Sequence, residues 1–140
     1  MNKLDITGLV NAVSSLERSV NVVIRKEQSE ETPADELETL HAGVIQAFEF
    51  SYELCWKFIK RWIEMNVGND VVDGVPRREL FRQGAENKLI SDVDKWMEFH
   101  GARNRTSHTY GENTAAEVYQ YSVEFLPYAK ALLLCLEKKI

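Results

Sequence analysis

Apolar residues recur every three or four positions along most of this chain, and this spacing constrains its fold more than any other feature. Between residues 5 and 29, for example, Leu9, Val13, Leu16 and Val20 follow one another at these steps. Such spacing places the side chains on one face of an α-helix, whereas a half-buried strand needs strict alternation, which the chain lacks. The pattern predicts an all-α protein, an up-and-down bundle of four or five helices.

The second predicted helix is unusually long. Thr32, Pro33 and Asp35 have the order of an N-cap, a first helical position and a capping box, and the apolar period continues to about residue 67, where Gly68 ends it. Such a helix exceeds about 50 Å at 1.5 Å per residue. Its middle is aromatic on more than one side, so one face is predicted to pack within the bundle and another against a second copy of the chain. We therefore expect a homodimer.

Three further helices are predicted from the same period. A short helix covers about residues 76–87, and another follows Ser91, which we expect to cap it. The last helix is predicted to start at Thr114, and Pro127 should kink or split it, because proline cannot donate the helical hydrogen bond.

Length and composition favour one domain, residues 1–140, in a reducing compartment. A chain of 140 residues with 44% hydrophobic residues suits a single core. Cys55 and Cys135 lie in apolar runs and are predicted to be reduced thiols. The first residues lack the apolar stretch of a signal peptide, and no apolar run reaches membrane-spanning length. We therefore expect a soluble, cytoplasmic protein with no membrane contact.

Charge argues against coating long nucleic acid without specificity, since the net charge is −5. The charge is uneven, however. Residues 77–110 carry seven Lys/Arg against five Asp/Glu, whereas residues 1–76 carry seven against thirteen. The locally basic stretch is a mild indication of an anionic ligand there, and a solvated charged face explains it equally well.

The concentrated polar chemistry lies at the end of this basic stretch. Arg103 offers a planar set of donors that matches a phosphate, and His108 titrates near neutral pH and can act as a general base or acid. Side chains that can hydrogen-bond an oxyanion or a sugar surround them: Asn104, Arg105, Thr106, Ser107 and Thr109. By composition alone, a capped and solvated turn explains this segment better than a site does.

Spacing adds a constraint on Arg103 and His108. Residues five apart on a continuous α-helix are rotated by about 140° from each other, so the two side chains would face different sides. If they act together, the helix must break near residues 104–107, or each must find its partner on a second subunit. A two-fold dimer places equivalent patches face to face, so a composite site across the axis is a natural solution.

Four blocks of sequence resemble a known family. Arg103, His108 and Tyr110 have the Arg-x4-His-x-Tyr spacing of HEPN-domain proteins, which are small helical bundles. More closely, residues 47–57, 76–82, 89–92 and 103–110 resemble, in this order, the nucleotidyltransferase substrate-binding subfamily. The likeness covers nearly the whole chain.

The resemblance implies a homodimeric bundle that works beside a separately encoded minimal nucleotidyltransferase. That partner would carry the nucleotide and the Mg²⁺, and this chain would hold no cofactor or metal of its own. The sequence agrees, because it has neither the Gly-Ser strand turn nor the paired Asp motif of a nucleotidyltransferase, so we expect no nucleotidyl transfer by this chain alone. The first interpretation is a non-catalytic, substrate-binding partner in a two-component complex.

The resemblance also implies an alternative. Some HEPN relatives are metal-independent RNases of toxin–antitoxin pairs, neutralised by the nucleotidyltransferase. On that reading His108 activates the ribose 2′-hydroxyl and Arg103 stabilises charge on the phosphate. The binding residues for RNA or a nucleotide would be Asn104, Arg105, Ser107 and Tyr110. Tyr110 matches a tyrosine that the partner can modify with adenylate, whereas Arg105 departs from the apolar residue that is common in the subfamily.

Other polar residues are given structural roles. The three His do not form the pair or cluster that zinc prefers, so His41 is predicted to be packed or solvated, and for His100 packing is at least as good an explanation as a place in the cleft. Glu49, Glu53 and Lys57 lie one turn apart and are predicted to form an exposed ion-pair ladder, although contact with a partner stays open.

Overall fold

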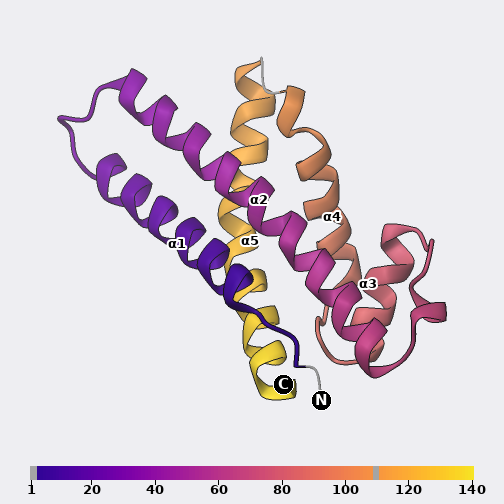
Figure 1. Ribbon diagram of the computed structural model, residues 1–140. Helices are drawn as coiled ribbons and strands as arrows, with labels where there is room; N and C mark the ends of the chain where they lie inside the picture. Colours follow the sequence, from indigo (N-terminus) through magenta and orange to yellow (C-terminus); the bar gives the residue numbers. More distant parts are fainter. Residues whose placement is uncertain (1–2, 109–110) are drawn as a thin grey trace.

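The all-α prediction is confirmed by a computed structural model that describes residues 3–108 and 111–140, apart from the side chains of residues 108 and 112. The described residues form helices and two short 3₁₀ turns, with no strand among them. The helices, labelled in Figure 1, are α1 (Thr7–Glu27), α2 (Ala34–Asn66), α3 (Arg77–Glu86), α4 (Val93–Asn104) and α5 (Glu112–Lys139).

Helix α2 is the centre of the bundle. It forms an antiparallel hairpin with α1, and it contacts α3, α4 and α5 as well. Figure 1 shows α5 crossing behind this hairpin, with its C-terminal end near the start of α1. Because α2 touches every other helix, its polar residues can meet side chains from distant parts of the sequence.

The core beneath the site is aromatic and centres on Phe125 of α5. Its ring lies 5.2 Å from that of Phe48, 5.4 Å from that of Trp96 and 5.1 Å from that of Phe99, measured between centroids, in edge-to-face contacts. Such pairs contribute about 0.5–1.5 kcal/mol each beyond the burial of area. These contacts fix α2, α4 and α5 against one another and so give the polar residues on α2 and α4 a rigid support.

The start of α2 differs from the prediction. Thr32 does not cap it, because its hydroxyl donates instead to the backbone oxygen of Lys26 at the end of α1, at 2.9 Å. Pro33 stands at the N-cap with extended backbone rather than at the first helical position. The Thr-Pro signal therefore located the boundary to within a residue, but the hydroxyl closes the preceding helix.

Two other helix starts are shifted. The cap of α4 is Asp92, whose carboxylate accepts from the backbone N–H of Lys95 at 3.0 Å, so the prediction of Ser91 is wrong by one residue. Helix α5 begins at Glu112, two residues before Thr114. The carboxylate of Asp92 accepts a hydrogen bond from a backbone N–H more strongly than the hydroxyl of Ser91 would, because a bond to a charged acceptor is stronger.

Pro127 lies inside α5, which continues through it, so of the two predicted effects, a kink or a split, the split does not occur. The proline is exposed, whereas Phe125, Ala129 and Leu132 around it are buried. Packing on both sides of the proline therefore outweighs the loss of one hydrogen bond.

Two further expectations concern the whole chain. Both cysteines are free thiols, as predicted, and burial raises the pKa of Cys55. Among the residues that the structure describes, no helix combines the length and the apolar character needed to cross a membrane.

Candidate functional site

The C-terminal end of α4 positions the predicted motif. Arg103 lies in the last turn of α4, the helix ends at Asn104, and residues Thr106–His108 form a 3₁₀ turn. The chain thus breaks inside the segment 104–107, as the spacing of Arg103 and His108 requires if the two are to act together. A continuous helix would hold these residues about 140° apart, and this break removes that constraint.

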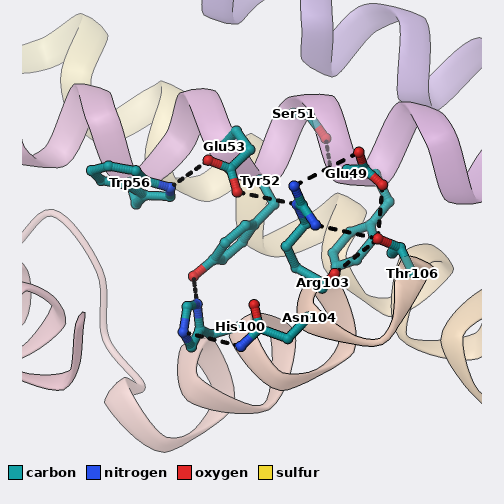
Figure 2. Close-up of polar contacts among 10 residues, drawn as sticks. Glu49, Ser51, Tyr52, Glu53, Trp56, His100, Arg103, Asn104 and Thr106 are labelled. Atoms are coloured by element: carbon teal, nitrogen blue, oxygen red, sulfur yellow. Dashed lines mark hydrogen bonds and ion pairs between the residues drawn. The ribbon is translucent and has the colours of Figure 1, made fainter. Parts of the chain in front are cut away.

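Two carboxylates of α2 hold the guanidinium of Arg103 (Figure 2). Its Nε lies 3.1 Å from Oε1 of Glu53, and its Nη2 lies 3.7 Å from Oε1 of Glu49. The prediction that Glu49 and Glu53 form a ladder with Lys57 is therefore wrong, because α4 supplies a better-placed cation. The side chain of Arg103 is still 28% exposed, so an anion can reach it from solvent.

Thr106 ties the 3₁₀ turn to one of these carboxylates, Glu49. Its hydroxyl donates to Oε2 of Glu49 at 2.7 Å, and Nη1 of Arg103 donates to the Thr106 oxygen at 3.3 Å. Glu49 therefore binds both sides of the break between α4 and the turn. This cross-link fixes the direction in which the chain leaves Arg103 toward residue 108.

A second polar chain runs from the core to Asn104 (Figure 2). The hydroxyl of Tyr52 lies 2.8 Å from Nδ1 of His100, and Nε2 of His100 lies 3.4 Å from the side-chain nitrogen of Asn104. Burial raises the pKa of Tyr52, which keeps it protonated. Burial, helped by the nearby positive charges of Arg77 and Arg103, lowers the pKa of His100 and keeps its ring neutral near pH 7. A neutral ring can join the two side chains, accepting on one nitrogen and donating on the other.

The carboxylate of Glu53 also reaches away from Arg103. Its Oε2 accepts from the indole N–H of Trp56 at 3.0 Å, as Figure 2 shows. The guanidinium of Arg77, at the start of α3, stacks on the other side of this contact, 3.4 Å from the centroid of the Trp56 ring. Glu53 and Trp56 together thus connect Arg103 at the end of α4 with Arg77 at the start of α3.

The other predicted site residues are not all brought together. Arg105 points to α5, where its Nη2 lies 3.0 Å from Oε1 of Glu117, and Ser107 is exposed. Tyr110 and the side chain of His108 lie outside the described residues. Of the predicted motif, the structure therefore places Arg103, Asn104 and Arg105 in three different sets of contacts: with Glu49 and Glu53, with His100, and with Glu117.

Sequence reasoning missed the roles of five residues here: Glu49 and Glu53 as partners of Arg103, and Tyr52, Trp56 and Arg77 in the contacts around them. The signal for the residues of α2 was present, since Glu49, Glu53 and Trp56 recur at helical steps and share a face. What the spacing could not show is which helix that face meets. The described residues also contain no group of three side chains that could hold a metal ion.

Comparison with known proteins decides the family. The family described as nucleotidyltransferase substrate binding protein like matches residues 4–138, nearly the full length. The chain belongs to this family.

Individual relatives agree with this family in sequence and fold. The chain is 34% identical, over 133 residues, to a protein of Haemophilus influenzae named probable ribonuclease HepT, covering 94% of this chain and 91% of that one. A solved structure from the same species, described as the fold of a substrate binding domain of a nucleotidyltransferase, superposes with a TM-score of 0.88 at 33% identity, over 95% of this chain and 99% of that chain. A structure from Thermus thermophilus, with a TM-score of 0.64 and 20% identity over 86% of this chain and 98% of that chain, shares the fold alone.

Proposed function

We propose that this protein is a metal-independent ribonuclease of the HEPN type, which works with a separately encoded minimal nucleotidyltransferase. The observation that carries the proposal is the end of α4 at Asn104, followed by a 3₁₀ turn through His108. This break lets one arginine and one histidine serve a single phosphate. The name of the Haemophilus influenzae relative, probable ribonuclease HepT, supports the same activity.

The chemistry follows from the two side chains. His108 takes the proton of the ribose 2′-hydroxyl, and the 2′-oxygen attacks the adjacent phosphorus. The bond from phosphorus to the 5′-oxygen breaks, and the 5′-oxygen receives the proton from the imidazolium. The products are a 2′,3′-cyclic phosphate and a 5′-hydroxyl. Arg103 stabilises the negative charge that grows on the phosphoryl oxygens.

The surrounding residues would position these two. Glu49 and Glu53 hold the guanidinium of Arg103, and Thr106 joins Glu49 to the turn. Asn104, oriented by His100, would bind the substrate beside them, with Arg105, Ser107 and Tyr110 as outer contacts. A homodimer would bring two such sites together across its axis.

The second half of the proposal concerns the partner, which the description of the family suggests. A nucleotidyltransferase that carries the nucleotide and Mg²⁺ would dock on this bundle in the cytoplasm and neutralise it. Adenylation of Tyr110, two residues from His108, would add bulk and negative charge beside the phosphate site. Either effect would exclude RNA from Arg103.

The decisive experiment is cleavage of labelled single-stranded RNA in EDTA by the wild-type protein, Arg103→Ala and His108→Ala. General acid–base catalysis by His108 and charge stabilisation by Arg103 each contribute about 100-fold or more, so each variant should lose at least that factor. Arg78→Gln is the matched control, because this exposed arginine pairs with Asp94 on the surface. The control variant should cleave RNA as the wild type does. Activity that survives in His108→Ala, or fragments without 2′,3′-cyclic phosphate ends, would contradict the mechanism.

One observation favours a second candidate function, a non-catalytic substrate-binding subunit of the nucleotidyltransferase. Arg103 already faces two carboxylates, which oppose the approach of a phosphate. On this reading the polar network serves recognition, and His108→Ala leaves function intact. A folded wild-type protein that binds its nucleotidyltransferase but never cleaves RNA, alone or after removal of the partner, would establish this candidate instead.

A further inference from the structure

A cleft lies beside Trp56, on the side of the network away from Arg103. Its volume is about 180 Å³, and it lies between the C-terminal half of α2 and the start of α3. Lys60 and Arg77 supply its cationic wall, and Trp56 and Leu80 supply apolar surface. Pockets that bind drug-sized ligands have volumes of about 300–1,000 Å³. The cleft is therefore of a size for a phosphate group with part of its sugar, rather than for a whole cofactor.

The two cations in this cleft are available to an anion. In the described part of the chain, neither Lys60 nor Arg77 forms an ion pair with a carboxylate. The Nε of Arg77 is buried and lacks a hydrogen-bond partner among the described residues. Its guanidinium is held flat against Trp56, and the indole is held by Glu53, so the arginine is ordered before any ligand arrives.

The start of α3 adds to this positive character. Pro76 caps α3 without a side-chain hydrogen bond, so no cap side chain occupies the first amide groups of the helix. The N-terminal end of a helix carries a partial positive charge that favours anions. Gly74, which borders the cleft with φ of 68°, would meet nothing within 4 Å if it had a Cβ, so the backbone is open to an approaching group here. The cleft thus combines two cations, an aromatic wall and a helix start.

The cleft and the proposed catalytic site lie along the same face of α2. Glu53, Trp56 and Lys60 are three and four residues apart and so share one face of α2. Glu53 and Lys60 are separated by about 10 Å along the helix axis at 1.5 Å per residue. An RNA strand with one phosphate at Arg103 that runs along this face of α2 would therefore bring another of its phosphates to this cleft.

We propose that the cleft formed by Trp56, Lys60 and Arg77 binds a backbone phosphate of the RNA, next to the linkage that is cleaved at Arg103. The proposal rests on the ribonuclease function, and it assigns to α2 and α3 a part of substrate binding that lies outside the Arg-x4-His segment. Lys60 and Arg77 neutralise the phosphate, and Trp56 keeps the arginine in place.

The test measures binding without cleavage. A fluorescent single-stranded RNA of about ten nucleotides carries 2′-O-methyl groups, which block the nucleophile, and its anisotropy is followed at several salt concentrations. Lys60→Ala and Arg77→Gln should each weaken binding at least threefold, and the double variant should reduce the slope of log K against log[salt] by about 0.7, the value for one phosphate of a single strand. Arg61→Gln and Arg78→Gln, one position away along the chain, are matched controls that should bind as wild type does.

Each outcome decides one point. Unchanged affinity and slope in the double variant, or a wild-type protein that does not bind this RNA, would overturn the cleft. AMP is titrated separately. If AMP binding depends on Lys60 and Arg77 and RNA binding does not, the cleft is a site for a free nucleotide and the proposal is overturned. Thermal melting shows whether Arg77→Gln is folded, and Lys60→Ala tests the proposal in any case.

The two proposals fail in different ways. Cleavage in EDTA by a wild-type protein whose cleft variants bind RNA normally would leave the ribonuclease standing and remove the cleft. Binding that depends on Lys60 and Arg77, with no cleavage under any condition, would keep the cleft as an RNA site and remove the catalytic role of His108.

Discussion

At the scale of single residues, the guanidinium of Arg103 is held by carboxylates and is partly open to solvent. Its charge is opposed by Glu49 and Glu53, yet the side chain keeps an exposed edge. Carboxylates that hold a guanidinium restrict its rotamers, so it can meet a phosphate oxygen with little further loss of entropy. The same carboxylates repel the phosphate. If Arg103 binds a phosphate as proposed, this opposition would make binding depend on a second cation. The hydrogen bond from Thr106 to Glu49 ties the turn after α4 to the same carboxylate.

Removing the hydroxyl of Tyr52 tests the polar chain behind Asn104. Tyr52→Phe deletes the 2.8 Å hydrogen bond to His100 and leaves the imidazole nitrogen without that partner in a half-buried position. We expect the free energy of unfolding to fall by about 1–2 kcal/mol. Urea denaturation measures it. As a control, Tyr121→Phe loses an exposed contact of 3.4 Å to Glu98 and should change the free energy of unfolding by less than about 0.5 kcal/mol. Equal losses in the two variants would contradict a stabilising role for the hydrogen bond between Tyr52 and His100.

The lowered pKa of His100 predicts a pH dependence of stability. Its pKa is near 6.5 when unfolded and lower in the folded protein, mainly because of burial. Below about pH 6.5 the unfolded state therefore binds more protons than the folded state. As the pH is lowered, the free energy of unfolding falls until the pH is below the pKa of His100 in the folded protein. Acidification from about pH 7.5 to 5.5 should destabilise the wild type more than His100→Gln. Parallel losses in both proteins would show that His100 does not contribute.

At the scale of elements, the polar site depends on where helices end. Helix α4 stops at Asn104, and its last turn presents Arg103 to α2. The start of α3 presents Arg77 to the same face of α2. Helix ends carry unpaired backbone groups and can change direction. They therefore bring side chains of α3 and α4 to a helix that runs past both.

Pro127 provides a prediction about α5. Pro127→Ala restores one backbone donor and removes the clash of the ring with the preceding turn, while the exposed position leaves the core untouched. The interior cost of proline is about 3 kcal/mol relative to alanine, part of which packing has already absorbed. We expect the free energy of unfolding to rise by about 1–3 kcal/mol in urea denaturation. A loss of stability would mean that α5 needs a bend at this position.

At the scale of the whole molecule, apolar surface on the long helix α2 remains uncovered. Phe50 is 61% exposed, the most of any large hydrophobic side chain in the described residues, although it lies between the buried Phe48 and Tyr52. A side chain of this size in water costs free energy that a second copy could recover. This observation agrees with the expected homodimer.

Sedimentation equilibrium at micromolar concentration tests that expectation. The wild-type protein should have twice the mass of one chain, 16.1 kDa. Phe50→Asp should shift the equilibrium toward the monomer, because burying an unpaired carboxylate in an apolar interface costs several kcal/mol. A wild-type monomer would exclude a composite site across a dimer axis, and a dimer that Phe50→Asp leaves intact would place the interface elsewhere.

The sequence by itself determined the helices, the free thiols and the family. It offered a break near residues 104–107 as one of two ways for Arg103 and His108 to act together, and the structure shows that α4 ends there, at Asn104. These features depend on the spacing of apolar residues, on capping signals or on the order of sequence blocks, and all of these can be read along the chain without knowing which helices pack together. The exact caps differed from the prediction. The hydroxyl of Thr32 donates to the backbone oxygen of Lys26 instead of capping α2, and Asp92 rather than Ser91 accepts the hydrogen bond that caps α4.

Only the tertiary structure decided what the polar residues meet. Glu49 and Glu53 appeared to form a ladder with Lys57, but Arg103, at least 50 positions away, pairs with both. Arg77 stacks on Trp56 for the same reason. Which faces of two helices meet depends on how their side chains interdigitate and on the rotation that the aromatic core around Phe125 allows. That is a property of the packed bundle, and helical spacing along the chain does not contain it.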